Sequence, residues 1–274
     1  MAPSEAFIEL NNMSLFVQRI EQFENAPTII FLHDSLGCVR LWRDFPAKLC
    51  NSVRCNLVMY DRQGYGKSST LLNHHRSNNY LEIEAEILSH IIAKLKLQNV
   101  ILFGHSDGGS IALIAAAKYP RLVGGVIVEA AHVFVEQLTL DGIRAMANAY
   151  ETTDLRNRLE KYHGDKTETI FKAWTETWLG SDFRGWNIEY FLSGIHCPLL
   201  FIQGDQDEYG TTAQLQAVAR QVSGIVVTSL IPAVHHTPHR QVESEVISCA
   251  TAFIKSNALT SFKARINTGG KESG

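Results

Sequence analysis

Six short, almost wholly apolar runs set the strongest limit on how this chain can fold. The runs are rich in β-branched residues, as strands buried on both faces of a sheet are. Stretches with the helical spacing of apolar residues lie between most of them. Strand and helix alternating in this way predict crossover connections, and hence a mostly parallel sheet with helices on both faces. The apolar runs are residues 29–32, 57–60, 100–103, 126–128, 199–202 and 225–227, and the helical stretches include 82–97, 110–118, 214–222 and 243–254.

Two segments depart from this alternation. Residues 6–23 hold two strand-like runs around Asn11 and Asn12, which predict a hairpin at the sheet edge. Residues 132–193 have helical spacing and three of the four tryptophans but no strand of the core type, which predicts a helical cap over one end of the sheet. The expected organisation of the 274 residues is therefore a core at 1–131 and 194–256, a cap at 132–193 and a flexible tail at 257–274.

Composition and charge exclude several classes of function. Hydrophobic residues make up 45% of the chain and charged residues 19%, which is typical of a globular protein. The net charge of −3 argues against nucleic acid as a partner. No apolar run approaches the roughly 18 residues needed to cross a bilayer, and the N-terminus does not resemble a signal peptide. Five scattered cysteines without a CxxC pair indicate reduced thiols. We therefore expect a cytoplasmic protein with no membrane partner.

Residues 100–109, VILFGHSDGG, place a G-x-S-x-G motif between a buried strand and a helix of small residues. A serine becomes a useful nucleophile only when it is exposed and held against a base. A sharp turn from strand to helix lifts Ser106 clear of the sheet, and Gly104 and Gly108 relieve the crowding that this turn causes. The backbone N–H of Asp107, at the start of the helix, would point at a developing oxyanion. The alternative is a turn of glycine and serine without chemistry.

Together with three further segments, this motif resembles the α/β-hydrolase superfamily. The segments HDSLG at 33–37, DRQGYGKS at 61–68 and the C-terminal acid and histidine segments follow apolar strands in that fold's order. The resemblance covers about residues 8–254 and implies an α/β-hydrolase fold with a helical cap, a Ser-Asp-His triad and no cofactor. Relatives that are dehalogenases or epoxide hydrolases use an aspartate nucleophile, and Ser106 argues against both. The segment at 66–68 is no phosphate loop, because Asp61 stands where that loop requires glycine.

The segment at 33–37 differs from the pattern His-Gly-x-x-Gly that family members usually carry. Asp34 replaces the first glycine, and by position Ser35 is the second backbone donor of the oxyanion hole, beside Asp107. Asp34 constrains the backbone more than glycine does, so its effect on this donor stays open. His33 is interpreted as a residue that supports the loop rather than as a base.

The family's spacing also selects an acid and a base. After the apolar run at 199–202, the pattern Gly-x-x-Asp selects Asp207 rather than its carboxylate neighbours. The pattern Gly-His-x-Pro-His selects His236 as the base, with His235 standing where glycine is normal. His235 and His239 remain alternatives, and His239 is interpreted as structural. Nothing in the spacing makes this histidine cluster converge on one point, so no metal is expected there.

The cap is expected to determine which substrate is bound. His132 and Phe134 follow the fourth apolar run, and Trp178 and Trp186 lie in the cap, so these four residues are candidates for the substrate pocket. The alternative is that most cap aromatics only pack the cap on the core.

The predicted function is a cofactor-free serine hydrolase, or serine esterase, that cleaves an ester, lactone or related small carboxylic substrate through an acyl-enzyme on Ser106. Its expected partner is a small-molecule substrate, and the sequence does not determine whether it forms a homo-oligomer. Two enzymatic alternatives are a carbon–carbon bond hydrolase of aromatic ring-cleavage products and a cofactor-free perhydrolase. A third alternative is a receptor on the same fold that binds a small ligand with slow turnover or none.

Overall fold

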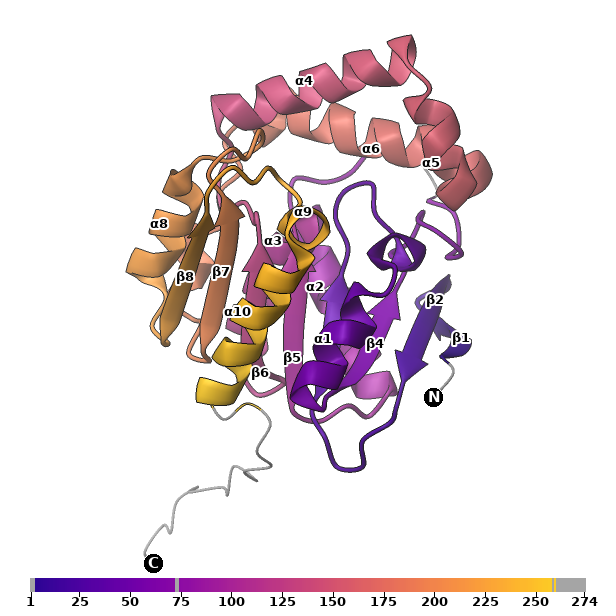
Figure 1. Cartoon of the computed structure of the whole chain (residues 1–274). Coiled ribbons are helices and arrows are strands. Elements are labelled where there is room, and N and C mark those ends of the chain that lie inside the picture. The colour runs from indigo at the N-terminus through magenta and orange to yellow at the C-terminus, as the bar shows by residue number, and fades with distance from the viewer. Residues whose placement is uncertain (1–2, 72–73, 258, 260–274) are drawn as a thin grey trace, which may run out of the picture.

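The computed structural model describes residues 3–71, 74–257 and 259. Its centre is an eight-stranded sheet in the order β1-β2-β4-β3-β5-β6-β7-β8, in which the pairings from β4 to β8 are all parallel (Figure 1). This confirms the fold class predicted from the alternating runs. The strands are β1 (Ser4–Leu10), β2 (Met13–Ile20), β3 (Thr28–Leu32), β4 (Asn56–Tyr60), β5 (Val100–His105), β6 (Val123–Glu129), β7 (Leu199–Gly204) and β8 (Val226–Ile231).

The antiparallel part of the sheet is the predicted hairpin. β1 pairs with β2, and β2 pairs in turn with β4 in antiparallel register. Asn11 and Asn12 join the two strands with φ angles of 47° and 66°. Two consecutive residues in the left-handed region form a two-residue hairpin turn whose twist matches that of the strands it joins. Asparagine adopts this region more readily than most residues do.

Successive side chains of the central strands enter two different cores, because strand side chains alternate between the two faces of a sheet. Ile30 and Leu32 of β3 belong to the core beneath α2, α3 and α8, whereas Ile29 and Phe31 belong to the core beneath α1 and α10. Figure 1 shows α1 and α10 in front of the sheet and α2 and α3 behind it. These helices are α1 (Phe45–Val53), α2 (Tyr80–Lys94), α3 (Asp107–Lys118), α8 (Thr212–Gln221) and α10 (Glu243–Ser256).

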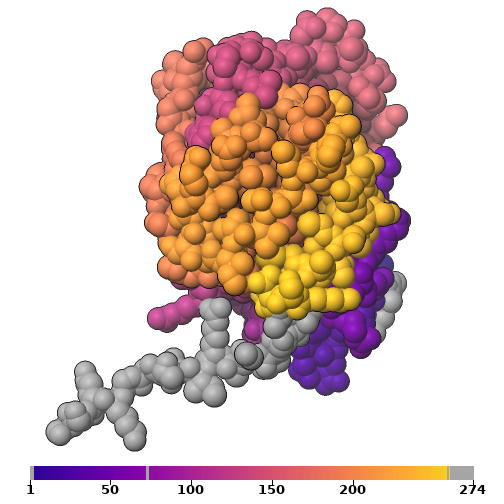
Figure 2. Space-filling model, turned by 60° about the vertical axis from the view of Figure 1, so that its left-hand side comes forward, coloured from indigo at the N-terminus to yellow at the C-terminus, as the bar shows by residue number. Residues whose placement is uncertain are grey.

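The segment between β6 and β7 is helical, and its helices α4, α5 and α6 lie over the carboxyl end of the parallel strands (Figure 1). Figure 2 shows the cap directly against the orange and yellow C-terminal part of the chain. Among the described helices, none is both long and apolar enough to cross a membrane. The division into core and cap stays a prediction, and residues 258 and 260–274 of the predicted tail lie outside the described residues. The remaining helices are α4 (Gln137–Thr152), α5 (Leu155–His163), α6 (Thr167–Leu179), α7 (Glu189–Leu192) and, after β8, α9 (Pro238–Gln241).

Candidate active site

Ser106 occupies a strained turn between β5 and α3. Its backbone has φ 54° and ψ −120°, a conformation that side chains seldom adopt. A Cβ atom on Gly104 would collide with the backbone carbonyl of Gly108, and a Cβ atom on Gly108 would collide with the carbonyl of Leu32. Only glycine therefore fits two residues before and two residues after the serine, because of the backbone crowding expected from the motif.

Loops after three parallel strands bring Ser106, His236 and Asp207 into one line of hydrogen bonds. The Oγ atom of Ser106 lies 3.0 Å from Nε2 of His236, and Nδ1 of His236 lies 2.8 Å from Oδ1 of Asp207. Because the carboxylate can only accept, Nδ1 carries the proton and Nε2 is left as an acceptor for the serine hydroxyl. Burial favours the neutral form of Asp207, but the charge and hydrogen bond of His236 outweigh it and lower the pKa of Asp207.

The two alternative histidines have other partners. His235 is exposed, with its Nδ1 atom 3.4 Å from Glu208. His239 is buried, and its Nδ1 atom lies 2.6 Å from Oε2 of Glu129. Within the described part of the chain, neither ring forms a hydrogen bond with Ser106.

The loop after β3 presents Ser35 to the same point. Its turn is closed by two hydrogen bonds to Asp34: the N–H of Gly37 donates to the Asp34 carbonyl at 3.2 Å, and the N–H of Leu36 donates to Asp34 Oδ1 at 3.0 Å. The N–H groups of Ser35 and Asp107 find no acceptor among the described residues. Two unpaired donors near a serine hydroxyl are what an oxyanion requires.

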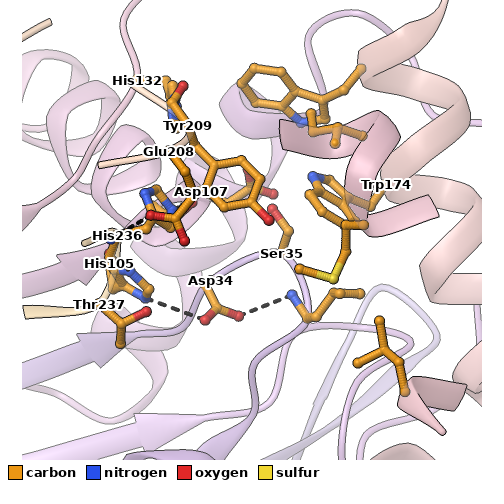
Figure 3. Close-up of a pocket in the computed structure, with 16 residues that line it drawn as sticks. Asp34, Ser35, His105, Asp107, His132, Trp174, Glu208, Tyr209, His236 and Thr237 are labelled. Atoms are coloured by element: carbon orange, nitrogen blue, oxygen red, sulfur yellow. Dashed lines mark hydrogen bonds and ion pairs between the residues drawn. The ribbon is translucent and has the colours of Figure 1, made fainter. Parts of the chain in front are cut away.

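The half-buried Asp34 side chain also forms an ion pair with the buried His105 beside the nucleophile. Its Oδ2 atom lies 3.3 Å from Nδ1 of His105, and Nε2 of His105 lies 2.8 Å from the carbonyl of His236 (Figure 3). Burial alone would lower the pKa of His105, but the hydrogen bond and charge of Asp34 raise it. Burial likewise opposes ionisation of Asp34, and His105 nevertheless holds the pKa of Asp34 far below its usual value. Both ring nitrogens of His105 thus face acceptors, as an imidazolium requires.

A family model described as the alpha/beta hydrolase fold matches residues 27–193 of this chain. The chain belongs to the α/β-hydrolase family. The mouse serine hydrolase BPHL is 28% identical over 254 residues, which cover 89% of this chain and 84% of the mouse protein. The human serine hydrolase BPHL is 26% identical over 263 residues, which cover 92% and 87% of the two chains. A solved membrane phospholipase A, described as a bacterial virulence factor, superposes with a TM-score of 0.77 at 18% identity, covering 93% of this chain and 87% of its own, and shows the fold alone.

Behind the nucleophile of this α/β-hydrolase, a buried polar network joins the two loops that carry the unpaired N–H groups. Arg62 NH2 donates to the Asp34 carbonyl at 2.7 Å, and Arg62 NH1 lies 3.6 Å from Oδ2 of Asp107. The Tyr80 hydroxyl donates to the same Asp107 oxygen at 3.0 Å and accepts from Nε1 of Trp178 at 2.9 Å. Sequence reasoning missed Arg62 and Tyr80. The only sequence signal for Arg62 was its position in the segment DRQGYGKS at 61–68, and no sequence signal pointed to Tyr80.

A cavity of about 240 Å³ opens above Ser106, between the sheet and the cap. Figure 3 shows Trp174 of α6 across this cavity from Asp34 and His236. Two of the four predicted pocket residues, His132 and Trp178, line it. The other two do not. Phe134 pairs instead with Asn187 in an isolated β-bridge. Trp186 stacks on Phe183, with ring centroids 5.3 Å apart. The apolar part of the lining consists of Leu36, Ile143, Met146, Leu155, Trp174 and Trp178.

Proposed function

We propose that this α/β-hydrolase is a cofactor-free serine esterase that cleaves an ester, lactone or related small carboxylic substrate. The observation that carries the proposal is the line of hydrogen bonds from Ser106 through His236 to Asp207, at 3.0 and 2.8 Å, whose first two members line the cavity. The relatives named serine hydrolases support the same reaction type.

In the proposed reaction, Nε2 of His236 takes the proton of Ser106 while Oγ attacks the substrate carbonyl carbon. The N–H groups of Ser35 and Asp107 bind the oxygen on which negative charge develops. His236 then gives its proton to the departing alkoxide, which leaves an acyl-enzyme on Ser106. A water molecule, deprotonated by His236, attacks the acyl carbonyl and releases the acid, and the proton returns to Ser106. Asp207 holds the imidazole tautomer and offsets its positive charge throughout.

The cavity lining favours a substrate whose acyl part is apolar and carries no negative charge. Beyond the hydrogen-bonded line, the wall consists largely of aliphatic side chains and two indoles. The described lining includes the carboxylates of Asp34, Asp107 and Glu208 but no Lys or Arg. His105 also lines the cavity, but both of its ring nitrogens are already paired, with Asp34 and with the carbonyl of His236. A substrate carboxylate would therefore lose its hydration without gaining an unpaired cationic partner, which is costly. This argues for the ester or lactone reaction over hydrolysis of ring-cleavage products that bear carboxylates.

Labelling with a fluorophosphonate tests the activated serine. We expect the wild-type protein to be labelled and the Ser106→Ala variant not to be. If neither protein is labelled while small apolar ligands still raise the melting temperature, the chain is a ligand receptor and the proposal fails.

A substrate screen then tests the charge preference. It compares p-nitrophenyl butyrate with the p-nitrophenyl monoester of glutaric acid, which has a similar acyl group but bears a terminal carboxylate. We expect kcat/KM to be at least about 10-fold higher for the neutral ester. A cost of about 1.4 kcal/mol for removing the carboxylate of the charged ester from water is enough for that ratio. The same series measures the turnover of lactones and of dienoic ring-cleavage compounds. It also measures the turnover of carboxylic acids in the presence of hydrogen peroxide. A faster reaction with a dienoic acid or with peroxide would replace the esterase proposal by one of these alternatives.

A further inference from the structure

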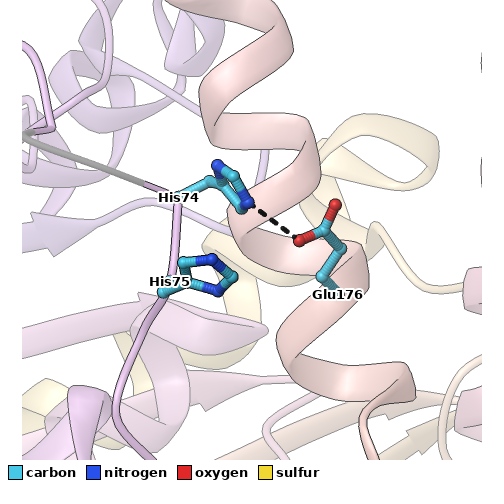
Figure 4. A group of neighbouring side chains, drawn as sticks. All are labelled: His74, His75 and Glu176. Atoms are coloured by element: carbon cyan, nitrogen blue, oxygen red, sulfur yellow. Dashed lines mark ion pairs between the residues drawn. The ribbon is translucent and has the colours of Figure 1, made fainter.

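A second group of metal-ligating side chains lies outside the active-site cavity. His74 and His75 belong to the loop before α2, and Glu176 belongs to the cap helix α6 (Figure 4). One ligand atom from each residue lies within 4.8 Å of the other two. Two segments that are about 100 residues apart in the chain therefore meet here through two imidazoles and a carboxylate.

The distances within this group suit a transition-metal ion. Zinc binds imidazole nitrogen and carboxylate oxygen at about 2.0–2.2 Å, so neighbouring ligand atoms of a tetrahedral site are about 3.4 Å apart. Nε2 of His74 and Oε2 of Glu176 already have that separation, at 3.2 Å. The ligand atom of His75 lies within 4.8 Å of the other two, so the third ligand has to move closer by up to about 1.4 Å to complete the site.

The surroundings of the group leave room for such an ion. The three side chains border a groove of about 180 Å³ that is also lined by Arg76, Asn78 and Asp182. Arg76, the nearest cation along the loop, has other partners: its NH2 group donates to the Tyr65 hydroxyl, and its guanidinium lies 4.9 Å from the centre of the Tyr80 ring. Among the described residues, no Lys or Arg lies within 4 Å of the Glu176 carboxylate; Lys172, one turn earlier on α6, instead forms its ion pair with Glu168 at 2.8 Å and acts on Glu176 only at longer range.

We propose that His74, His75 and Glu176 bind one divalent transition-metal ion of the zinc type, with water completing the coordination. Two imidazoles and one carboxylate favour such an ion over Mg²⁺ or Ca²⁺, which prefer oxygen ligands throughout. The site is independent of the esterase proposal, because none of its ligands lines the active-site cavity.

The bound ion has a structural role, because it ties α6 to the loop before α2. Glu176 lies two residues from both Trp174 and Trp178, and two residues correspond to about 200° around a helix. Glu176 thus faces away from the side of α6 that carries the two indoles of the cavity wall. An ion held there does not touch the substrate, but it fixes the helix that forms this wall.

Calorimetric titration with ZnCl₂, after dialysis against a chelator, tests the site on the full chain. We expect one ion per chain, and a melting temperature about 5 °C higher when zinc is present at 100 times its dissociation constant. Each of His74→Ala, His75→Ala and Glu176→Gln should weaken binding at least about 10-fold, since even partners outside the coordination shell contribute that much. Wild-type protein that binds no zinc at about 100 μM overturns the proposal.

The Glu86–His90 pair provides a matched control. It is also exposed, with His90 Nε2 3.8 Å from Glu86 Oε1, but both residues lie on α2 and no second imidazole joins them in the described structure. His90→Ala should bind zinc as tightly as wild type. If the Glu176→Gln and His74→Ala variants also bind as wild type does, zinc binds elsewhere and the assignment is wrong.

Two further readouts locate the ion. In long-range ¹H–¹⁵N spectra, the imidazole signals of His74 and His75 should shift when zinc is added, and the signal of His90 should not. Hydrogen exchange of α6 should slow in wild type with zinc but not in His74→Ala. A shift confined to His235 and His236 would place the ion at the active site and overturn the proposal.

Discussion

Two imidazole–carboxylate pairs lie side by side in this protein and have different surroundings. Asp207 binds Nδ1 of His236 at 2.8 Å, and Glu129 binds Nδ1 of His239 at 2.6 Å. Both carboxylates are buried. The two pairs are therefore alike in the contact that is usually taken to mark a catalytic histidine.

The pairs differ in what the rest of each imidazole ring meets. Nε2 of His236 lies 3.0 Å from the hydroxyl of Ser106. The ring of His239 packs between Trp42 and Phe45, with ring centroids 4.7 and 5.3 Å away. Burial lowers the pKa of His239 despite its partner, which keeps this ring neutral inside the core. A carboxylate partner thus makes a histidine's buried position tolerable, and only access to a nucleophile gives that histidine a chemical role.

Removal of the two imidazoles should separate these roles most strongly. His236→Ala should lower kcat for a p-nitrophenyl ester about 10⁶-fold, because the serine then has no base. His239→Ala should give folded, partly active protein. The control is His235→Ala, whose exposed side chain should change kcat less than about 3-fold. Loss of activity in His239→Ala with retention in His236→Ala would make His239 the base.

Replacing the carboxylate of each pair by an amide should give the next largest difference in kcat between the two pairs. Asp207→Asn should lower kcat about 10⁴-fold, since asparagine neither holds the required tautomer nor offsets the imidazolium charge. Glu129→Gln should lower kcat less than about 10-fold. Steady-state kinetics near pH 7.5 on both variants checks this, and equal losses would mean that the second pair also takes part in turnover.

The free energy of unfolding should depend more on the His239–Glu129 pair than on the His236–Asp207 pair, which is the reverse of the order expected for kcat. His239→Ala should lower the free energy of unfolding by about 3–5 kcal/mol, because Glu129 loses its hydrogen-bond partner in the core and the missing ring leaves a cavity beside Trp42 and Phe45. Adding Glu129→Gln should recover part of that loss. Urea denaturation monitored by circular dichroism measures both variants. A loss below about 1 kcal/mol in His239→Ala would show that neither this hydrogen bond nor the packing of the ring stabilises the core.

The pair Asp34–His105 should differ from both in its dependence on pH. The pKa of His105 is raised, so the stability from its charge is full below about pH 6.5 and is lost as pH rises through the higher folded value. The pKa of Asp34 is lowered, so its contribution is present above about pH 4 and is lost only in strong acid. Asp34→Asn should therefore cost about 2 kcal/mol at pH 6 and less at pH 9. An equal cost at both pH values would mean that His105 is uncharged.

The sequence predicted those parts of the site whose geometry is local. Gly104 and Gly108 flank the serine on one turn, so their spacing alone encoded the close backbone approach. Asp207 and His236 came from spacing within single loops. The family pattern selected His236 but left His235 and His239 as alternatives, because the choice depends on which ring reaches Ser106 from a loop 130 residues away.

The parts that were not predicted depend on long-range packing. The periodicity of the cap predicts helices but not which side of each helix faces the cavity, so it does not identify Met146 of α4 as a lining residue. Phe134 and Trp186 lie in the connections outside these helices, and their place depends on packing that the sequence pattern does not encode. Arg62 and Tyr80 meet Asp107 from 45 and 27 residues away in the sequence. A buried polar partner at such a distance leaves no pattern in a single sequence.

The hydrogen bond from Trp178 to Tyr80 determines how this protein can be recombined with its relatives. Exchanging the cap is an obvious way to alter which substrates an α/β-hydrolase accepts, with joints near residues 132 and 193. Here the indole of α6 donates to a tyrosine of the core, and that tyrosine donates to the residue after the nucleophile. A donor cap therefore has to bring a tryptophan to position 178, or the chimera has to replace Tyr80 as well.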